Sequence, residues 1–298
     1  MVPNQIQNTL ELFKIVIDGD DDDATRLVPL CVLNLPTLNE HASIFRLGCR
    51  AEPNPIGLGA LPIPAPSRRP FRDKAEDAII LFSMEIEDVP PDGEQHRHPE
   101  MHSFTFIVHR RALAAHIPAK HHSCAPYCCS VVPPGEPVQV PWDAWGIAAT
   151  RWFEDGVSLM RRITTTAGQH TVTMEGSAPT PIMVRDFNPY AVHAACARAA
   201  AAATAKANAG SSNRQSLREE LQQAPQGHNW SEQLANGNRM TFKVEESVLP
   251  VGNKFQEDVR SALPYVEVVT RAKYSYSGVL IDEERILGLK VRFHPRIY

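Results

Sequence analysis

Apolar and polar residues alternate along several short segments of the chain. In "SFTFIVH", residues 103–109, the side chains of Phe104, Phe106 and Val108 would share one face of an extended strand, and His109 would lie on the other face, away from the core. The same alternation in "MTFKVE" gives predicted core positions at Met240, Phe242 and Val244. A period of two is typical of a β-strand with one buried face.

Short segments rich in β-forming residues recur along the chain. Further predicted strands are "LCVLNL" (30–35), "IFRLGC" (44–49), "AIILFSMEI" (78–86), "TVTM" (171–174), "PIMVRDF" (181–187) and "YVEVVT" (265–270). Because turns and loops separate these strands in place of regularly spaced helices, the pattern favours antiparallel pairing over βαβ units. We therefore predict a mainly β, antiparallel fold, which could be a sandwich, a barrel or a propeller.

Three segments interrupt this strand pattern. A proline-rich run predicts a surface loop over residues 52–74. Residues 188–210 predict a helix, because Asn188 can cap it, a proline fits its first turn, alanines favour it and Gly210 ends it. The polar residues that follow, 211–236, predict a linker.

The composition narrows the possible functions. Hydrophobic residues make up 43% of the 298 positions, which is enough for a buried core, and the formal net charge is -4. This charge leaves no excess of positive groups for a phosphate backbone, so we expect no nucleic-acid partner. The apolar runs are strand-sized, shorter than the roughly 20 residues of a membrane-spanning helix, and no signal-peptide pattern is visible. We expect an intracellular protein, cytoplasmic or nuclear, with free thiols and no membrane association.

Histidine and cysteine concentrate in residues 96–129. The histidines are His96, His98, His102, His109, His116, His121 and His122, and the cysteines are Cys124, Cys128 and Cys129. Zinc prefers imidazole nitrogen and thiolate sulfur, so a zinc site at His121, His122, Cys124 and Cys128 is one hypothesis. The spacing argues against it, since the segment has no CxxC pair and no HExxH motif. We favour a polar loop with incidental histidines, and we expect no metal and no cofactor.

Motifs of the common catalytic sites are missing from the chain. It contains no GxSxG, no GxGxxG and no GxxxxGK[ST] sequence. The acidic run at residues 282–284 could supply an acid and a base, but carboxylates on a turn more often accept hydrogen bonds from backbone amides. We therefore expect a non-enzymatic protein.

Aromatic residues are the best candidates for recognition. The segment "VPWDAWGIAATRWF" contains Trp142, Trp145 and Trp152, and "YSYSG" contains Tyr274 and Tyr276. Large aromatic side chains dominate the binding energy of many protein interfaces, so these five residues are our candidate partner-binding residues. A role in the core is the alternative, and we favour it more for the tryptophans than for the tyrosines.

Several blocks of the sequence resemble a known family. "FTFIVHRRALAAHIP", "VPWDAWGIAATRWF", "RDFNPYAV" and "LPYVEVVTRAKYSYSGVLIDEERILGLKV" are similar to the C-terminal β-rich region of uncharacterised F-box domain-containing proteins of mushroom-forming fungi. "LCVLNLP" and "CRAEPNP" resemble the preceding strands, so the resemblance extends over most of the chain. In that group an N-terminal F-box joins a cullin-type ubiquitin ligase, and the β-rich region, which resembles an irregular propeller, recognises another molecule.

The resemblance implies one propeller-like domain over residues 1–298, irregular or incomplete. It also implies a protein-interaction scaffold similar to the substrate-recognition region of a ubiquitin-ligase subunit, with an unknown protein partner. The helical F-box itself is not found, because "LNLPTLNEHASIF" favours strand, turn and strand. We expect a ubiquitin-ligase adaptor as partner only if an F-box exists upstream. The alternatives are a zinc-binding protein or metal-dependent enzyme centred on residues 96–129, and a truncated chain without independent function.

Overall fold

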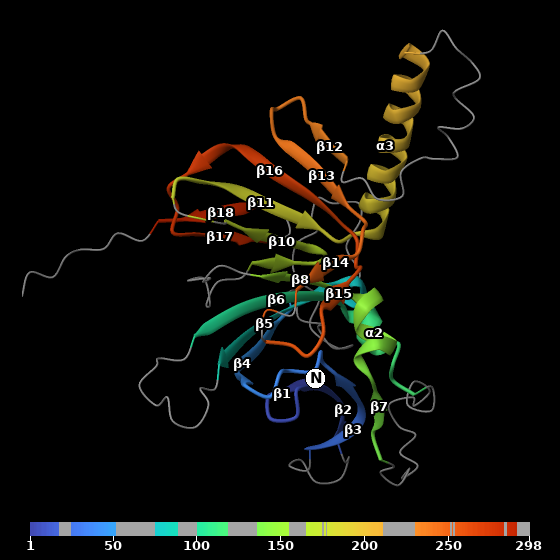
Figure 1. Cartoon of the computed structure of the whole chain (residues 1–298), viewed down its shortest axis with the longest axis vertical. Coiled ribbons are helices and arrows are strands. Elements are labelled where there is room, and N and C mark those ends of the chain that lie inside the picture. Colours follow the sequence, from blue (N-terminus) through green and yellow to red (C-terminus); the bar gives the residue numbers. More distant parts are fainter. Residues whose placement is uncertain are drawn as a thin grey trace, which may run out of the picture. The chain divides into compact units, whose positions relative to one another are not determined.

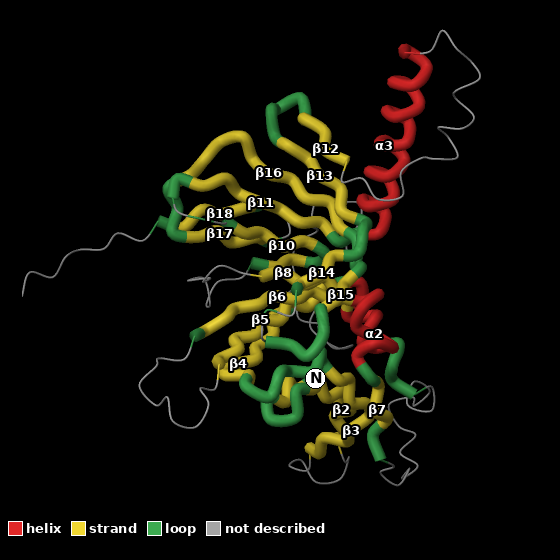
Figure 2. Tube along the Cα trace, in the orientation of Figure 1, coloured by secondary structure: helices red, strands yellow, loops and turns green. Residues whose placement is uncertain are grey.

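The protein is mainly β, and its described strands form open, predominantly antiparallel sheets, as the alternation predicts (Figures 1 and 2). This computed structural model describes residues 1–17, 25–51, 75–88, 100–118, 136–154, 165–174, 176, 178–210, 230–250, 252, 254–282 and 285–290. Contacts group the chain into unit 1, Met1–Ser158 with Ser247–Ala262, and unit 2, Leu159–Glu246 with Leu263–Tyr298. The single domain over residues 1–298 that the resemblance implies stays a prediction.

Unit 1 contains two four-stranded sheets. The first has the order β1-β2-β3-β7, with bounds Val2–Asn4, Thr9–Ile17, Thr25–Asn34 and Val138–Val140. The second has the order β4-β5-β6-β8, with bounds Ala42–Arg50, Ile79–Asp88, Met101–His109 and Thr150–Glu154. Strand β7 runs parallel to β3, which departs from the predicted antiparallel pairing. A long connection between two strands permits this direction, whereas a tight hairpin does not.

Shorter elements complete unit 1. They are the 3₁₀ helix η1 (Ala75–Asp77), the helices α1 (Arg110–Ala114) and α2 (Trp142–Ala149), and the paired strands β14 (Ser247–Leu249) and β15 (Val259–Ser261). The tryptophan-rich segment therefore begins as helix α2 and continues directly into strand β8.

Both sheets of unit 1 share one hydrophobic core. Leu10 and Leu33 of the first sheet belong to the same buried cluster as Phe82 and Phe106 of the second, and all four side chains have no exposed surface. Both sheets therefore bury side chains in the same core, to which Trp145 of α2 and Phe255 also belong.

Unit 2 is built on a six-stranded sheet in the order β12-β13-β16-β11-β10-β9. The bounds in chain order are β9 (Thr166–Ala167), β10 (His170–Thr173), β11 (Thr180–Asp186), β12 (Trp230–Gln233), β13 (Arg239–Lys243) and β16 (Tyr265–Tyr274). Helix α3 (Pro189–Gly210) and the hairpin β17 (Gly278–Ile281) to β18 (Ile286–Leu289) belong to the same unit. Figure 1 shows α3 beside β13 and the hairpin beside β10 and β11.

One face of the six-stranded sheet carries the core of unit 2. The register places Met240, Val268, Val184 and Val172 in a row across four strands, and directly paired residues point to the same face. Val192 of α3 packs at the Met240 end of this row. Val279 of the hairpin packs at the Val172 end. Helix and hairpin therefore cover neighbouring parts of the same face.

The helix and the strands test the sequence-based expectations. Helix α3 covers the predicted segment 188–210, and the Tyr190 amide donates to Asn188 Oδ1 at 2.9 Å, which confirms the predicted cap. Residues 230–233 of the predicted linker form β12 instead, because they pair with β13. The rest of that linker up to residue 229 and the loop 52–74 lie outside the described residues.

Two predicted faces need correction. His109 lies on the expected face of β6 but is only 4% exposed, and its Nδ1 lies 3.0 Å from the carbonyl oxygen of Asp77. That face of β6 is therefore covered as well. Val244, predicted to be in the core, is 42% exposed because β13 ends one residue earlier, at Lys243.

Candidate functional site

The zinc ligands proposed from the sequence, His121, His122, Cys124 and Cys128, lie outside the described residues. Three cysteines are described, and all three are free thiols: Cys31, Cys49 and Cys196. Burial raises the pKa of both the Cys31 and the Cys49 thiol, so these two side chains lack the low pKa of a catalytic nucleophile. Asp282 of the acidic turn accepts a hydrogen bond from the Arg285 amide at 2.6 Å, which fits the expected structural role.

The three candidate tryptophans belong to the core of unit 1 or pack against it. Trp145 and Trp152 are 3% and 2% exposed, so they offer almost no surface to a partner. Trp152 stacks on Phe106 with ring centroids 4.5 Å apart, and the Trp145 indole donates to the Asn34 carbonyl at 2.8 Å. Half-buried Trp142 makes edge contacts with both other indoles. Trp145 and Trp152 are therefore core residues in place of the predicted partner contacts, and a partner-binding role for half-buried Trp142 stays a prediction.

The two candidate tyrosines lie together in unit 2. Tyr274 ends β16, and its ring stacks on that of Tyr276 with centroids 5.3 Å apart and planes 10° apart. Both side chains are half-buried and pack against the cluster around Val172 and Val279. A side chain on Gly288 would collide with the Tyr276 ring, so this glycine makes room for the stack. The tyrosines keep some exposed surface, and their role as partner-binding residues stays a prediction.

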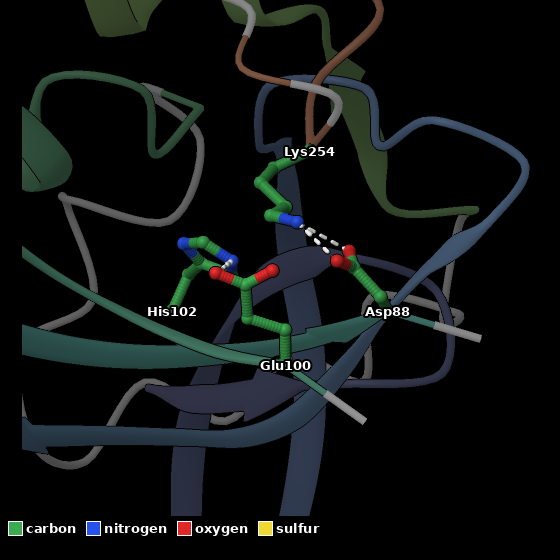
Figure 3. A network of polar contacts seen from close by, with 4 residues as sticks. All are labelled: Asp88, Glu100, His102 and Lys254. Atoms are coloured by element: carbon green, nitrogen blue, oxygen red, sulfur yellow. Dashed lines mark hydrogen bonds and ion pairs between the residues drawn. The ribbon is translucent and has the colours of Figure 1, made fainter. Parts of the chain in front are cut away.

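A polar cluster of four side chains occupies one end of strands β5 and β6 (Figure 3). Asp88 is the last residue of β5, Glu100 directly precedes β6, and His102 is the second residue of β6. Antiparallel pairing brings these two strand ends together, and the Asp88 amide donates to the Glu100 carbonyl at 3.2 Å. Lys254 joins the cluster from a distant part of the chain.

Lys254 is the cation of this cluster. Its side chain is only 6% exposed, and Nζ lies 2.5 Å from both carboxylate oxygens of Asp88. Its carbonyl oxygen accepts a hydrogen bond from the Asn39 amide at 2.9 Å. The next residue, Phe255, forms a β-bridge with Leu38. Lys254 therefore ties the loop around residues 37–39 to the end of β5.

His102 and Glu100 form the other half of the cluster. Nε2 of His102 lies 3.5 Å from Oε1 of Glu100, and Figure 3 shows the two side chains facing each other. The possible ligand atoms of Asp88, Glu100 and His102 all lie within 4.8 Å of one another. Two carboxylates and one imidazole at such distances offer oxygen and nitrogen ligands to a cation.

A groove of about 610 Å³ with an uncharged lining lies beside this cluster in unit 1, where Ala42 of the groove pairs with Asp88. It is lined by Gln5, Ile6, Gln7, Asn8, Asn34, Leu35, Thr37, Leu38, Ala42, Ser43 and Ile44. Its polar side chains are amides and hydroxyls, without a charged group. The last three residues open strand β4, which is an edge of its sheet among the described strands.

Asn8 is held rigidly at this groove. Its φ of 53° lies in the left-handed region, which asparagine tolerates better than most residues. Its Nδ2 donates to the Pro36 carbonyl at 2.7 Å, and its backbone carbonyl accepts from the Leu35 amide at 3.1 Å. Oδ1 of Asn8 is buried and has no hydrogen-bond partner among the described residues.

The sequence signal for these two sites is weak. His102 falls in the histidine-rich segment. Asp88 and Lys254 are 166 positions apart, and no sequence motif predicts that they contact each other. The groove residues come from two connections, the last residue of β3 and the start of β4, which only the folded chain brings together. Comparison with protein-family models, with curated proteins and with solved structures finds no match for this chain.

Proposed function

We propose that this chain is a non-enzymatic protein-interaction module that binds an extended peptide of its partner along the edge of β4, which no other described strand pairs with. The observation that carries the proposal is the edge position of this nine-residue strand, whose first three residues line the groove. An edge strand presents backbone N–H and C=O groups that its own sheet does not use. An extended peptide can pair with such an edge, so that backbone hydrogen bonds provide affinity and side-chain pockets provide specificity.

The chemistry of the groove indicates the type of peptide. The lining combines uncharged amide and hydroxyl groups with apolar side chains, so it favours an uncharged peptide segment that has both polar and apolar side chains. Phe45 adds an apolar contact, because a β-bulge between Ile44 and Arg46 leaves its side chain 57% exposed next to the groove.

The resemblance to fungal F-box proteins agrees with this role. In that group the β-rich region recognises a molecule other than the ligase, and peptide recognition is a common form of such binding. A propeller-like arrangement and a role in ubiquitin-ligase substrate recognition are part of this proposal. The four-stranded sheet β4-β5-β6-β8 has the strand number of a propeller blade. A ubiquitin-ligase adaptor would bind only through an F-box, which the sequence blocks do not include.

The test is selection of a peptide followed by edge substitution. A library of linear peptides displayed on phage is panned against the purified full chain, and the affinity of a selected peptide is measured. Phe45→Lys is expected to weaken binding at least about tenfold, because a charged side chain on an edge strand opposes pairing. The matched control is Ile15→Lys on β2, where the side chain is 63% exposed and outside the groove lining. It should change the affinity by less than about twofold. Selection of no peptide, or equal affinity of the Phe45→Lys variant, would contradict the proposal.

A further inference from the structure

We propose that Asp88, Glu100 and His102 bind a divalent transition-metal ion, with Zn²⁺ as the probe. These residues form the one group of three metal-ligating side chains found in the part of the chain that the structure describes. The site lies close to the peptide groove, because Asp88 pairs with Ala42 of the groove lining, but it uses other side chains and does not depend on the proposed function. It also differs from the zinc hypothesis at His121 to Cys128, because it uses carboxylates and a single histidine.

The donor set selects the class of metal. Zinc in proteins takes imidazole nitrogen and carboxylate oxygen, whereas magnesium and calcium take oxygen ligands. The imidazole of His102 therefore favours Zn²⁺ over Mg²⁺. With three protein ligands, a fourth position remains for water, as in zinc sites that are not fully enclosed by the protein.

The distances fit after a small side-chain movement. Zinc bonds of about 2.0–2.2 Å in a tetrahedron separate neighbouring ligand atoms by about 3.4 Å. His102 Nε2 and Glu100 Oε1 are 3.5 Å apart, so this pair already has the required spacing. The remaining separations reach at most 4.8 Å, and closing them requires movement of about 1 Å. The Glu100 side chain is 75% exposed, so it can rotate towards an ion without disturbing the core.

The imidazole of His102 gives a second, independent indication of a ligand. Its Nε2 is shielded from solvent, yet it makes no hydrogen bond to any residue that the structure describes. Oε1 of the Glu100 carboxylate lies 3.5 Å from it. A buried polar atom without a hydrogen bond costs about 1–3 kcal/mol. A metal ion between His102 and Glu100 would satisfy this nitrogen.

Lys254 is compatible with an ion at this place. A carboxylate oxygen has two lone pairs, so Asp88 can accept from the Lys254 ammonium and still bind a metal. Ligating carboxylates are commonly held by hydrogen bonds from neighbouring groups. Two carboxylates and one ammonium leave a net negative charge, which favours a divalent cation over an empty cluster.

The experiment measures metal binding to the full chain without a histidine tag. After removal of bound metal with a chelator, Zn²⁺ and Mg²⁺ are titrated by calorimetry against the wild type and three variants. Glu100→Gln and His102→Ala remove one ligand each. The control Cys124→Ala with Cys128→Ala removes thiols of the alternative zinc segment. Thermal melts followed by circular dichroism check that each variant folds. Glu100→Gln is expected to fold as the wild type does, because the Glu100 side chain is exposed.

The proposal predicts that the wild type binds one Zn²⁺ per chain. Glu100→Gln and His102→Ala should each lower the affinity for Zn²⁺ at least tenfold. The cysteine double variant should bind Zn²⁺ as the wild type does, and Mg²⁺ should bind at least tenfold more weakly than Zn²⁺. The proposal is overturned if the wild type takes up no Zn²⁺, if Glu100→Gln and His102→Ala bind it unchanged, or if the cysteine variant abolishes uptake. Equal affinity for Mg²⁺ would overturn the choice of metal.

Discussion

At the residue scale, aromatic packing explains where the large side chains lie. Phe82, Phe106 and Trp152 stand opposite one another on β5, β6 and β8, and both neighbouring ring pairs have centroids 4.5 Å apart. Such a cross-strand row fixes the register of three strands, because a slip of one residue would move every ring to the other face. Trp152 is thus part of the core that the two sheets of unit 1 share.

Removal of the Trp152 ring tests this assignment. Trp152→Ala should lower the free energy of unfolding by about 3–5 kcal/mol, since it empties a large buried volume between Phe106 and Phe255. Tyr190→Ala, where the side chain is 86% exposed, is the control and should change stability by less than about 0.5 kcal/mol. Urea unfolding followed by tryptophan fluorescence or circular dichroism measures both. A cost below about 1 kcal/mol for Trp152→Ala would argue against a core role.

At the element scale, strand positions were predictable and strand partners were not. The alternation in residues 103–109 and 240–245 identifies β6 and β13, because a buried face leaves a local pattern. Pairing depends on contacts between distant parts of the chain. The parallel pairing of β7 with β3 and the bridge between Leu38 and Phe255 therefore had no local signal.

In the candidate sites, too, single residues could be predicted from the sequence, but the contacts between distant residues could not. Glu100 and His102 lie two positions apart, and His102 belongs to the histidine-rich segment that the sequence identifies. Lys254 and Asp88 meet only because the segment after β14 returns to the end of β5. The edge position of β4 likewise depends on which strands pair, so the peptide groove could not be predicted from the sequence.

In helix α2, helix propensity and side-chain packing predict opposite changes in stability for the substitution Gly146→Ala. Gly→Ala inside a helix normally stabilises it by about 1 kcal/mol. At Gly146, however, an added Cβ would come within 2.0 Å of the Trp142 ring, so the ring or the helix must move. Gly146→Ala is therefore expected to destabilise unit 1 by about 1–3 kcal/mol, as overpacking does. Chemical denaturation gives the sign directly, and a gain in stability would show that Trp142 does not pack against Gly146.

At the scale of the whole molecule, composition and pattern identified the fold class but not the arrangement. The chain is mainly β with predominantly antiparallel sheets, as predicted, yet its contacts form two units with separate hydrophobic clusters. In unit 1 the two sheets share one hydrophobic core. No helix among the described residues has both the length and the apolar character to cross a membrane.

Hydrogen–deuterium exchange of the full chain, with and without a selected peptide, tests the central claim most directly. If the peptide pairs with the edge of β4, amides of residues 42–50 should exchange more slowly in the complex, because they gain backbone hydrogen bonds. Strand β13 of unit 2 serves as the internal reference and should exchange unchanged. Unchanged exchange in β4, with protection appearing instead around Tyr274 and Tyr276, would contradict the assignment of the β4 edge as the binding site.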